Sequence, residues 1–135
     1  MNWFKPKPTP ITIVYDVLGR EIDRVPARDF LIPGLDLRNR NWPHAQLLRI
    51  AFDQADMRGI NLMGANLDQT YFRHCDLRGA NLELSHLNYA RFLECDLSGA
   101  NFYRAYIEHL NIERSIIDPT TYLMGTYAQE RCVLR

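Results

Sequence analysis

The feature that most constrains this chain is a five-residue period in its large apolar side chains. Every fifth residue from Ile32 to Tyr122 is apolar, nineteen positions without an exception. These residues are Ile32, Leu37, Trp42, Leu47, Phe52, Met57, Leu62, Leu67, Phe72, Leu77, Leu82, Leu87, Phe92, Leu97, Phe102, Ile107, Ile112, Ile117 and Tyr122. Because 47% of the chain is hydrophobic, chance would give such a run about once in a million trials or less. The period therefore reflects the fold.

A smaller residue recurs two places before most of these apolar residues, usually with Asp or Asn in between. The small residues are Ala45, Ala55, Ala65, Thr70, Cys75, Ala80, Ser85, Ala90, Cys95, Ala100 and Ala105. Neither an α-helix nor a flat strand keeps a five-residue pattern on one face, because their periods are 3.6 and 2. A chain that turns a corner every five residues does, with the small and the large residue both pointing inward.

A second period of twenty residues shows how many corners complete one turn. Its columns are Asp36, Asp56, Asp76 and Asp96; Arg38, Arg58 and Arg78; Asn41, Asn61, Asn81 and Asn101; and Gly59, Gly79 and Gly99. Four repeats therefore make one coil with four sides. The glycine column predicts a corner with positive φ, which glycine adopts cheaply, and the asparagine column predicts a ladder of side-chain amides.

The repeats resemble the A(D/N)Lxx motif of the pentapeptide-repeat family, as in Cys75–Gly79 and Ala80–Leu84. The resemblance implies an all-β chain, a right-handed quadrilateral parallel β-helix of nearly five coils, without an active site. Its core ladder is Phe52, Met57, Leu62, Leu67, Phe72, Leu77, Leu82, Leu87, Phe92, Leu97, Phe102 and Ile107.

The repeats predict four segments: an N-terminal tail (1–10), a β-hairpin cap (11–29), the β-helix (30–124) and a C-terminal tail (125–135). Residues 11–16 alternate in polarity, and a second alternating run follows Gly19, which is the pattern of a hairpin. A solenoid needs its ends covered, so we place this hairpin over the first coil. Arg40 stands in an inward small-residue slot, which indicates an irregular first coil.

The C-terminal tail leaves two alternatives. Either the tail folds back over the last coil, or the last coil packs against the last coil of a second copy in a two-fold dimer. Family members commonly dimerise end to end at the C-terminus, so the resemblance favours a homodimer through the C-terminal coil.

The Asp and Arg columns are the most unusual electrostatic feature of the sequence. Stacked carboxylates about 4.8 Å apart are expected to raise one another's pKa. The arginines, two residues along, can neutralise them, although Ser98 stands where Asp96 would have its arginine. We favour a solvated acidic ladder paired with a basic one over the alternative of a cation site.

The remaining reactive residue types do not form a known catalytic or cofactor motif. Cys75 and Cys95 lie one coil apart; we interpret both as small core residues, with a disulfide as the minor alternative. The outward positions of His44, His74, His86 and His109 predict solvated side chains. The sequence therefore predicts no catalytic residue, no metal and no cofactor.

The charge balance limits the partners. Sixteen basic and sixteen acidic residues cancel, so we expect no direct binding of nucleic acid. The chain shows no signal peptide and no run of 18 apolar residues, which predicts a cytoplasmic protein that does not enter a membrane.

Function must come from the outward side chains, and the main hypothesis is a rigid protein-interaction scaffold or regulatory binding module. Its support is a set of outward apolar residues: Leu48, Met63, Tyr71, Leu84, Tyr89, Leu93, Tyr103 and Tyr106. An alternative comes from the family, in which some members mimic B-form DNA, bind DNA gyrase and topoisomerase IV, and protect them from fluoroquinolones.

Two features count against a type II topoisomerase as the partner. Residues 30–124 hold eleven acidic and nine basic side chains, a net charge of −2, and the arginine column would cancel the field of the aspartates. The unbroken period also predicts that no loops project between coils. A further alternative is a structural component of phage or prophage origin, because a short hairpin before the ladder is reminiscent of pentapeptide-repeat proteins carried by phages.

Overall fold

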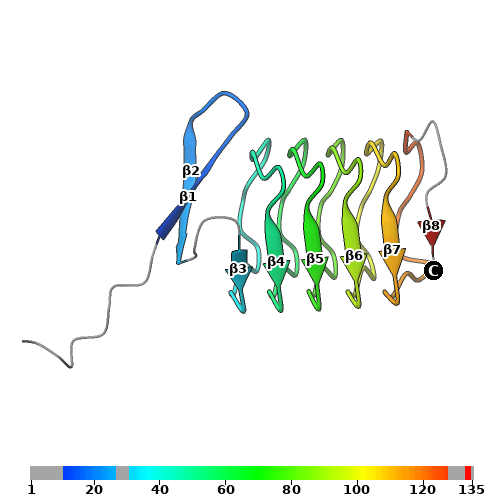
Figure 1. Ribbon diagram of the computed structural model, residues 1–135. Coiled ribbons are helices and arrows are strands. Elements are labelled where there is room, and N and C mark those ends of the chain that lie inside the picture. The colour runs from blue at the N-terminus through cyan, green and yellow to red at the C-terminus, as the bar shows by residue number, and fades with distance from the viewer. Residues whose placement is uncertain (1–10, 27–30, 128–132, 135) are drawn as a thin grey trace, which may run out of the picture.

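The computed structural model describes residues 11–26, 31–127 and 133–134, and the predictions for residues 1–10, 27–30, 128–132 and 135 lie outside them. The described chain is all-β (Figure 1). Its strands are β1 (Ile11–Tyr15), β2 (Glu21–Pro26), β3 (Leu31–Pro33), β4 (Ala51–Asp53), β5 (Tyr71–Arg73), β6 (Arg91–Leu93), β7 (Asn111–Glu113) and β8 (Val133–Leu134). Within the described ranges there is no helix long and apolar enough to span a membrane.

The strands from β3 to β8 form one parallel sheet in chain order, which we call side 1. Between β3 and β7, paired residues are twenty apart, as in Phe52 with Phe72 and Phe72 with Phe92. The other sides are joined by single parallel bridges. Side 2 contains Asp36, Asp56, Asp76, Asp96 and Ile116; side 3 contains Asn41, Asn61, Asn81, Asn101 and Tyr122; side 4 contains Gln46, Asn66, His86, Tyr106 and Tyr127. The predicted four-sided β-helix is confirmed.

The corners explain why Asp or Asn precedes the large inward residue. At one corner the Ala65 N–H donates to the Leu62 carbonyl at 3.0 Å, and Gly64 has a φ of 65°, which is the pattern of a type II turn. The Asn61 Oδ1 accepts the backbone N–H of Met63 at 3.1 Å, so the side chain holds the chain as it enters the turn.

Positive φ is not confined to the glycine column. Gly59, Gly79 and Gly99 have φ values of 66°, 67° and 70°, but twelve non-glycine residues also have positive φ, among them Asn39 in the glycine column itself. The repeated inter-coil hydrogen bonds impose this conformation on whatever residue stands there. Glycine therefore lowers the strain of a corner without being required for it.

We expect Gly79→Ala to lower the free energy of unfolding by about 1 kcal/mol, because a left-handed backbone is costly for any residue with a Cβ. An added Cβ at Gly79 meets no atom within 4 Å, whereas one at Gly59 would collide with Asn39 Oδ1. Gly59→Ala is expected to cost slightly more than Gly79→Ala, because the end of the flexible Asn39 side chain has to turn aside. Urea unfolding of both variants measures the difference, and an equal or reversed order would contradict this account.

The core lies inside the coil, and all twelve residues of the predicted core ladder are buried there. Phe72 stacks between Phe52 and Phe92, with ring centroids 5.1 and 4.5 Å away. The small polar residues of the core keep their hydrogen bonds: the Thr70 hydroxyl donates to the Leu47 carbonyl at 2.9 Å. One row of large residues and one row of small residues thus fill each coil.

The hairpin of β1 and β2 lies against the first coil (Figure 1). The Gln46 N–H donates to the Tyr15 carbonyl at 2.7 Å, and Trp42 Nε1 donates to Asp23 Oδ2 at 2.7 Å. Arg40 stands in an inward slot of the repeat, but its side chain is exposed and its Nη1 lies 3.1 Å from Asp23 Oδ2. A guanidinium inside the apolar coil would lack a partner, whereas the hairpin supplies a carboxylate.

The last coil contains one residue more than the others, so the prediction of an unbroken register is wrong. Asn101 pairs with Tyr122 and not with residue 121. Tyr122 is therefore 45% exposed instead of inward, and Leu123 packs against the core in its place. The extra residue is taken up at the turn after Asp118, where the Thr121 N–H donates to the Asp118 carbonyl at 3.0 Å.

The winding continues past residue 124, where the sequence places the end of the β-helix. Tyr127 pairs with Tyr106 on side 4, and β8 pairs in parallel with β7, with Leu134 opposite Ile112. The described part of the tail therefore follows the path of the coils and adds a strand to side 1.

Candidate interaction surfaces

Side 2 brings the predicted aspartate and arginine columns together as an Asp–Arg ladder of Asp36, Asp56, Asp76, Asp96, Arg38, Arg58 and Arg78. Each arginine donates two hydrogen bonds, from Nε and Nη2, to the carboxylate of the aspartate two residues before it. Arg58 Nε and Nη2 donate to Asp56 Oδ1 and Oδ2 at 2.9 and 2.7 Å. Arg58 Nε also lies 3.7 Å from Asp76 Oδ2 in the next coil, so the charges alternate along the solenoid.

The arginines lower the pKa of the carboxyls that they grip, and the expected rise in pKa is wrong. Side-chain hydrogen bonds from Arg38 hold the pKa of Asp36 well below its usual range. Arg58 lowers the pKa of Asp56 in the same way, and Arg78 that of Asp76. A bidentate guanidinium in hydrogen-bond contact outweighs a like charge one coil away.

We expect Arg58→Gln to raise the pKa of Asp56 toward its ordinary value. A carboxyl whose pKa is lowered by folding stabilises the fold above its unfolded pKa, and this stabilisation is lost as the pH falls through the folded pKa. Without Arg58 the folded pKa of Asp56 approaches the unfolded pKa, so this carboxyl stabilises the fold less and less stability is lost as the pH falls. NMR titration of the Asp56 carboxyl carbon measures the shift. Arg49→Gln is the control, because Arg49 donates to Gln69 and not to a carboxylate; an unchanged pKa in Arg58→Gln would refute the explanation.

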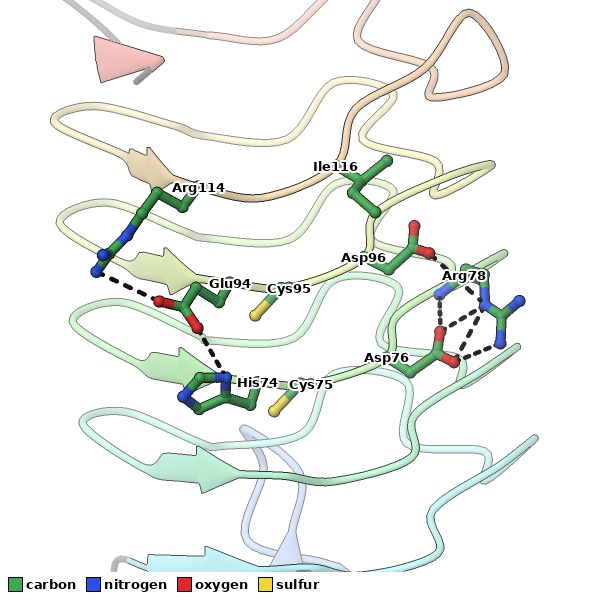
Figure 2. Close-up of a pocket in the computed structure, with 9 residues that line it drawn as sticks. All are labelled: His74, Cys75, Asp76, Arg78, Glu94, Cys95, Asp96, Arg114 and Ile116. Carbon is green, nitrogen blue, oxygen red and sulfur yellow. Dashed lines mark hydrogen bonds and ion pairs between the residues drawn. The ribbon is translucent and has the colours of Figure 1, made fainter.

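An open depression of about 420 Å³ lies where side 1 meets side 2 (Figure 2). Near side 1, His74 Nδ1 lies 3.1 Å from Glu94 Oε2, and Arg114 Nη2 lies 3.4 Å from Glu94 Oε1. The side 2 end is lined by Asp76, Arg78, Asp96 and Ile116. Charges of both signs are thus paired across three coils.

Cys75 and Cys95 lie between these two groups, and both are free and buried. The Cys75 thiol donates to the Phe52 carbonyl at 3.4 Å, and the Cys95 thiol to the Phe72 carbonyl at 3.4 Å. The contact with Cys75 and burial raise the pKa of the Cys95 thiol. Both residues therefore occupy the small-residue slot of the core.

The outward residues of side 4 change from polar amides to aromatic rings along the solenoid. Its first two coils present Gln46 and Asn66, and its last three present His86, Tyr106 and Tyr127. His86 stacks on Tyr106 with ring centroids 4.6 Å apart, and Tyr106 stacks on Tyr127 at 5.1 Å. We call these three residues, with Tyr89 and His109, the aromatic face.

Tyr89 and His109 extend the aromatic face onto the next corner. Their rings stack with centroids 4.7 Å apart. Tyr89 is 55% exposed, Tyr127 51% and Tyr106 39%. Of the other outward apolar residues that the sequence indicates, Leu48 and Leu84 are exposed, while Met63, Tyr71, Leu93 and Tyr103 are half-buried.

The histidines lie on the outside of the coil. His44, His74, His86 and His109 are all exposed, and two of them belong to the aromatic face. In the described part of the chain, His, Cys, Asp and Glu do not form a group of three that could hold a metal ion.

These surfaces lie on a chain whose relatives share its repeat. The sequence matches the profile of the pentapeptide repeat region over residues 45–122, more than half of the chain. The chain belongs to the pentapeptide-repeat family. No curated protein matches its sequence.

Solved pentapeptide-repeat structures support the same fold. A pentapeptide repeat protein from the thylakoid lumen of Arabidopsis thaliana matches with a TM-score of 0.58 and 22% identity, over 61% of this chain and 57% of that one. This pentapeptide-repeat protein therefore spans just over half the length of that relative, and the likeness concerns the fold.

Two other solved structures match less closely. Rfr23, from the cyanobacterium Cyanothece 51142, has a TM-score of 0.36 and 18% identity over 74% of this chain and 81% of its own. QnrB1 (R167E, trypsin-treated), a plasmid-mediated fluoroquinolone resistance protein, has a TM-score of 0.42 and 20% identity over 73% of this chain and 50% of its own. Both scores are too low to carry an argument.

The aromatic face was not predicted from the sequence as a unit. Tyr89 and Tyr106 were predicted as separate outward residues, and His86 and His109 as solvated side chains. The twenty-residue column that contains His86 and Tyr106 could have revealed their stacking. Tyr127 could not have been found this way, because it stands twenty-one residues after Tyr106.

Proposed function

We propose that this pentapeptide-repeat protein is a non-catalytic binding module that docks a protein partner on its aromatic face. The observation that carries the proposal is the exposed stack of His86, Tyr106 and Tyr127 beside Tyr89 and His109. Tyrosine and other aromatic residues are enriched at protein interfaces and dominate their binding energy. The first two coils of the same side present polar residues in the corresponding positions.

The rigidity of the solenoid supports this use of the surface. Each ring of the aromatic face is already held by a neighbouring ring one coil away, so binding would order few additional side chains. A smaller entropy cost leaves more of the contact energy for affinity. The coil beneath is closely packed, and a partner would meet a preformed surface.

The geometry of side 2 does not favour the DNA-mimic alternative, in which a type II topoisomerase is the partner. A face that imitates phosphate rows needs unneutralised negative charge. Asp36, Asp56 and Asp76 are each gripped by an arginine of their own coil. We therefore expect micromolar protein to leave gyrase supercoiling unchanged, with or without ciprofloxacin. Inhibition of supercoiling or rescue from the drug would replace our proposal with the DNA mimic.

Affinity capture with paired variants tests the aromatic face. Wild-type protein and the double variant Tyr89→Ala/Tyr106→Ala are immobilised and exposed to the same extract. Gln46→Ala/Arg49→Ala is the matched control, because these residues occupy the same two columns in the first coil. We expect a protein that is retained by the wild type and the control and lost by the aromatic variant. Equal retention by all three would refute docking on this face.

A further inference from the structure

The Asp–Arg ladder repeats one recognition unit three times and then changes. Asp36, Asp56 and Asp76 each receive Nε and Nη2 of the arginine two residues later, with donor–acceptor distances of 2.6–2.9 Å for the main pair of bonds. These pairs show how this surface binds a guanidinium. The planar guanidinium group donates two parallel hydrogen bonds to the two oxygens of an aspartate on side 2. The same backbone geometry continues to Asp96, which pairs in register with Asp76.

Asp96 lacks such a fork from its own coil, because Ser98 stands in the arginine column. Its Oδ1 accepts the Ser98 hydroxyl at 2.6 Å and the Ser98 N–H at 3.0 Å. Among the described residues, the guanidinium that approaches it is that of Arg78, whose Nε lies 3.9 Å from Asp96 Oδ2. Arg78 is already committed to Asp76.

The surroundings of Asp96 suit a long side chain with a cationic end. Ile116 takes the aspartate position of the next coil and is 55% exposed. Asp96 and Ile116 line the same end of the depression, and Figure 2 places Asp96 between Ile116 and Arg78.

We propose that the Asp96 end of the depression binds an arginine side chain of another protein. The Ser98 hydroxyl turns away from Asp96 Oδ1, the guanidinium then forks onto the carboxylate as Arg78 does onto Asp76, and the aliphatic stem packs on Ile116. Lysine fits less well because its ammonium cannot form the planar two-bond contact. The inference goes beyond the proposed function and does not rest on it, because Asp96 lies on side 2 and the aromatic face lies on side 4, the opposite side of the coil.

Titration with a small probe tests the site without the partner. Nα-acetyl-arginine amide is added to the ¹⁵N-labelled full chain, and the amide resonances of Asp96, Leu97 and Ser98 are followed by NMR. The contact is a single exposed ion pair, so we expect weak but saturable binding, with a Kd on the order of 10 mM. The lysine analogue should bind at least about threefold more weakly.

Two variants decide whether the arginine binds as proposed. Ser98→Arg supplies the guanidinium from the chain itself, in a column that already contains three arginines. Asp96→Asn removes the carboxylate charge. Each variant should reduce probe binding at least about fivefold. Asp36→Asn, at the other end of the ladder, is the control and should leave the shifts unchanged. If Asp96→Asn does not fold, Ser98→Arg carries the test.

Three results would overturn the proposal: no saturable shift at Asp96, equal binding of arginine and lysine, or full binding by Ser98→Arg. Failure of the proposed function has a different signature. Tyr89→Ala/Tyr106→Ala should leave the arginine titration unchanged, since these residues lie on side 4 and its corner. Equal retention of the captured protein by the wild type, the control and that variant would refute docking on the aromatic face and would leave the arginine titration unchanged.

Discussion

Phe72→Ala is expected to lower the free energy of unfolding by about 3–5 kcal/mol, because it opens a cavity in the middle of the core. Phe72 is fully buried, and its ring stacks on both Phe52 and Phe92. The neighbouring coils are tied to one another by backbone hydrogen bonds, so they cannot move together to fill the space. Urea unfolding followed by circular dichroism measures the loss.

The matched control for Phe72→Ala is Phe72→Leu, which keeps most of the buried volume and loses the ring stacking. We expect it to cost clearly less than the alanine variant, since aromatic pairs contribute about 0.5–1.5 kcal/mol each beyond area burial. A loss below about 1 kcal/mol for Phe72→Ala would mean that the coils relax around the cavity, and it would contradict the picture of a rigid stack.

Trp42→Ala should have an effect of similar size, about 3–5 kcal/mol, at the N-terminal end of the solenoid. Trp42 is fully buried in the first coil, and its indole N–H donates to Asp23 of the hairpin. The substitution therefore removes core volume and also a contact between the cap and the coil. Chemical denaturation gives the free energy of unfolding.

Trp42→Phe separates these two effects. It retains a large ring but cannot donate to Asp23, and a hydrogen bond to a charged group contributes about 1.5–3 kcal/mol. Amide hydrogen exchange on β1 and β2 supplies the second measurement: we expect faster exchange there than in the wild type, while β5 and β6 keep their protection. Unchanged exchange in the hairpin would show that this bond does not hold the cap.

The inward residues could be predicted from the sequence because every repeat places its small and its large inward residue at the same two positions. Every coil is hydrogen-bonded to its neighbours in the same way, so one five-residue rule applies along the chain, from Leu37 to Ile112. Where a residue was added near Asp118, the rule failed, and Tyr122 was placed inside although it lies outside. A period counted along the chain cannot detect a one-residue insertion when the shifted position happens to be apolar.

The candidate sites could be predicted only in part. The sequence indicated which carboxylates and arginines share side 2, because their spacing of twenty residues is visible. It did not indicate the sign of the pKa shift, because that depends on whether a guanidinium reaches hydrogen-bond distance of its own carboxylate. The Asp56–Arg58 contact at 2.7 Å decides this question.

The sequence by itself determined the four-sided coil and the identity of its core, since both follow from local periodicity and from the burial of apolar side chains. The tertiary structure alone decided which outward side chains come together to form a candidate binding surface. It brought His86, Tyr106 and Tyr127 into one stack across an irregular register. It also left Asp96 beside Ile116 without an arginine of its own coil. Such features depend on distances between coils, and these arise only when the chain has wound on itself.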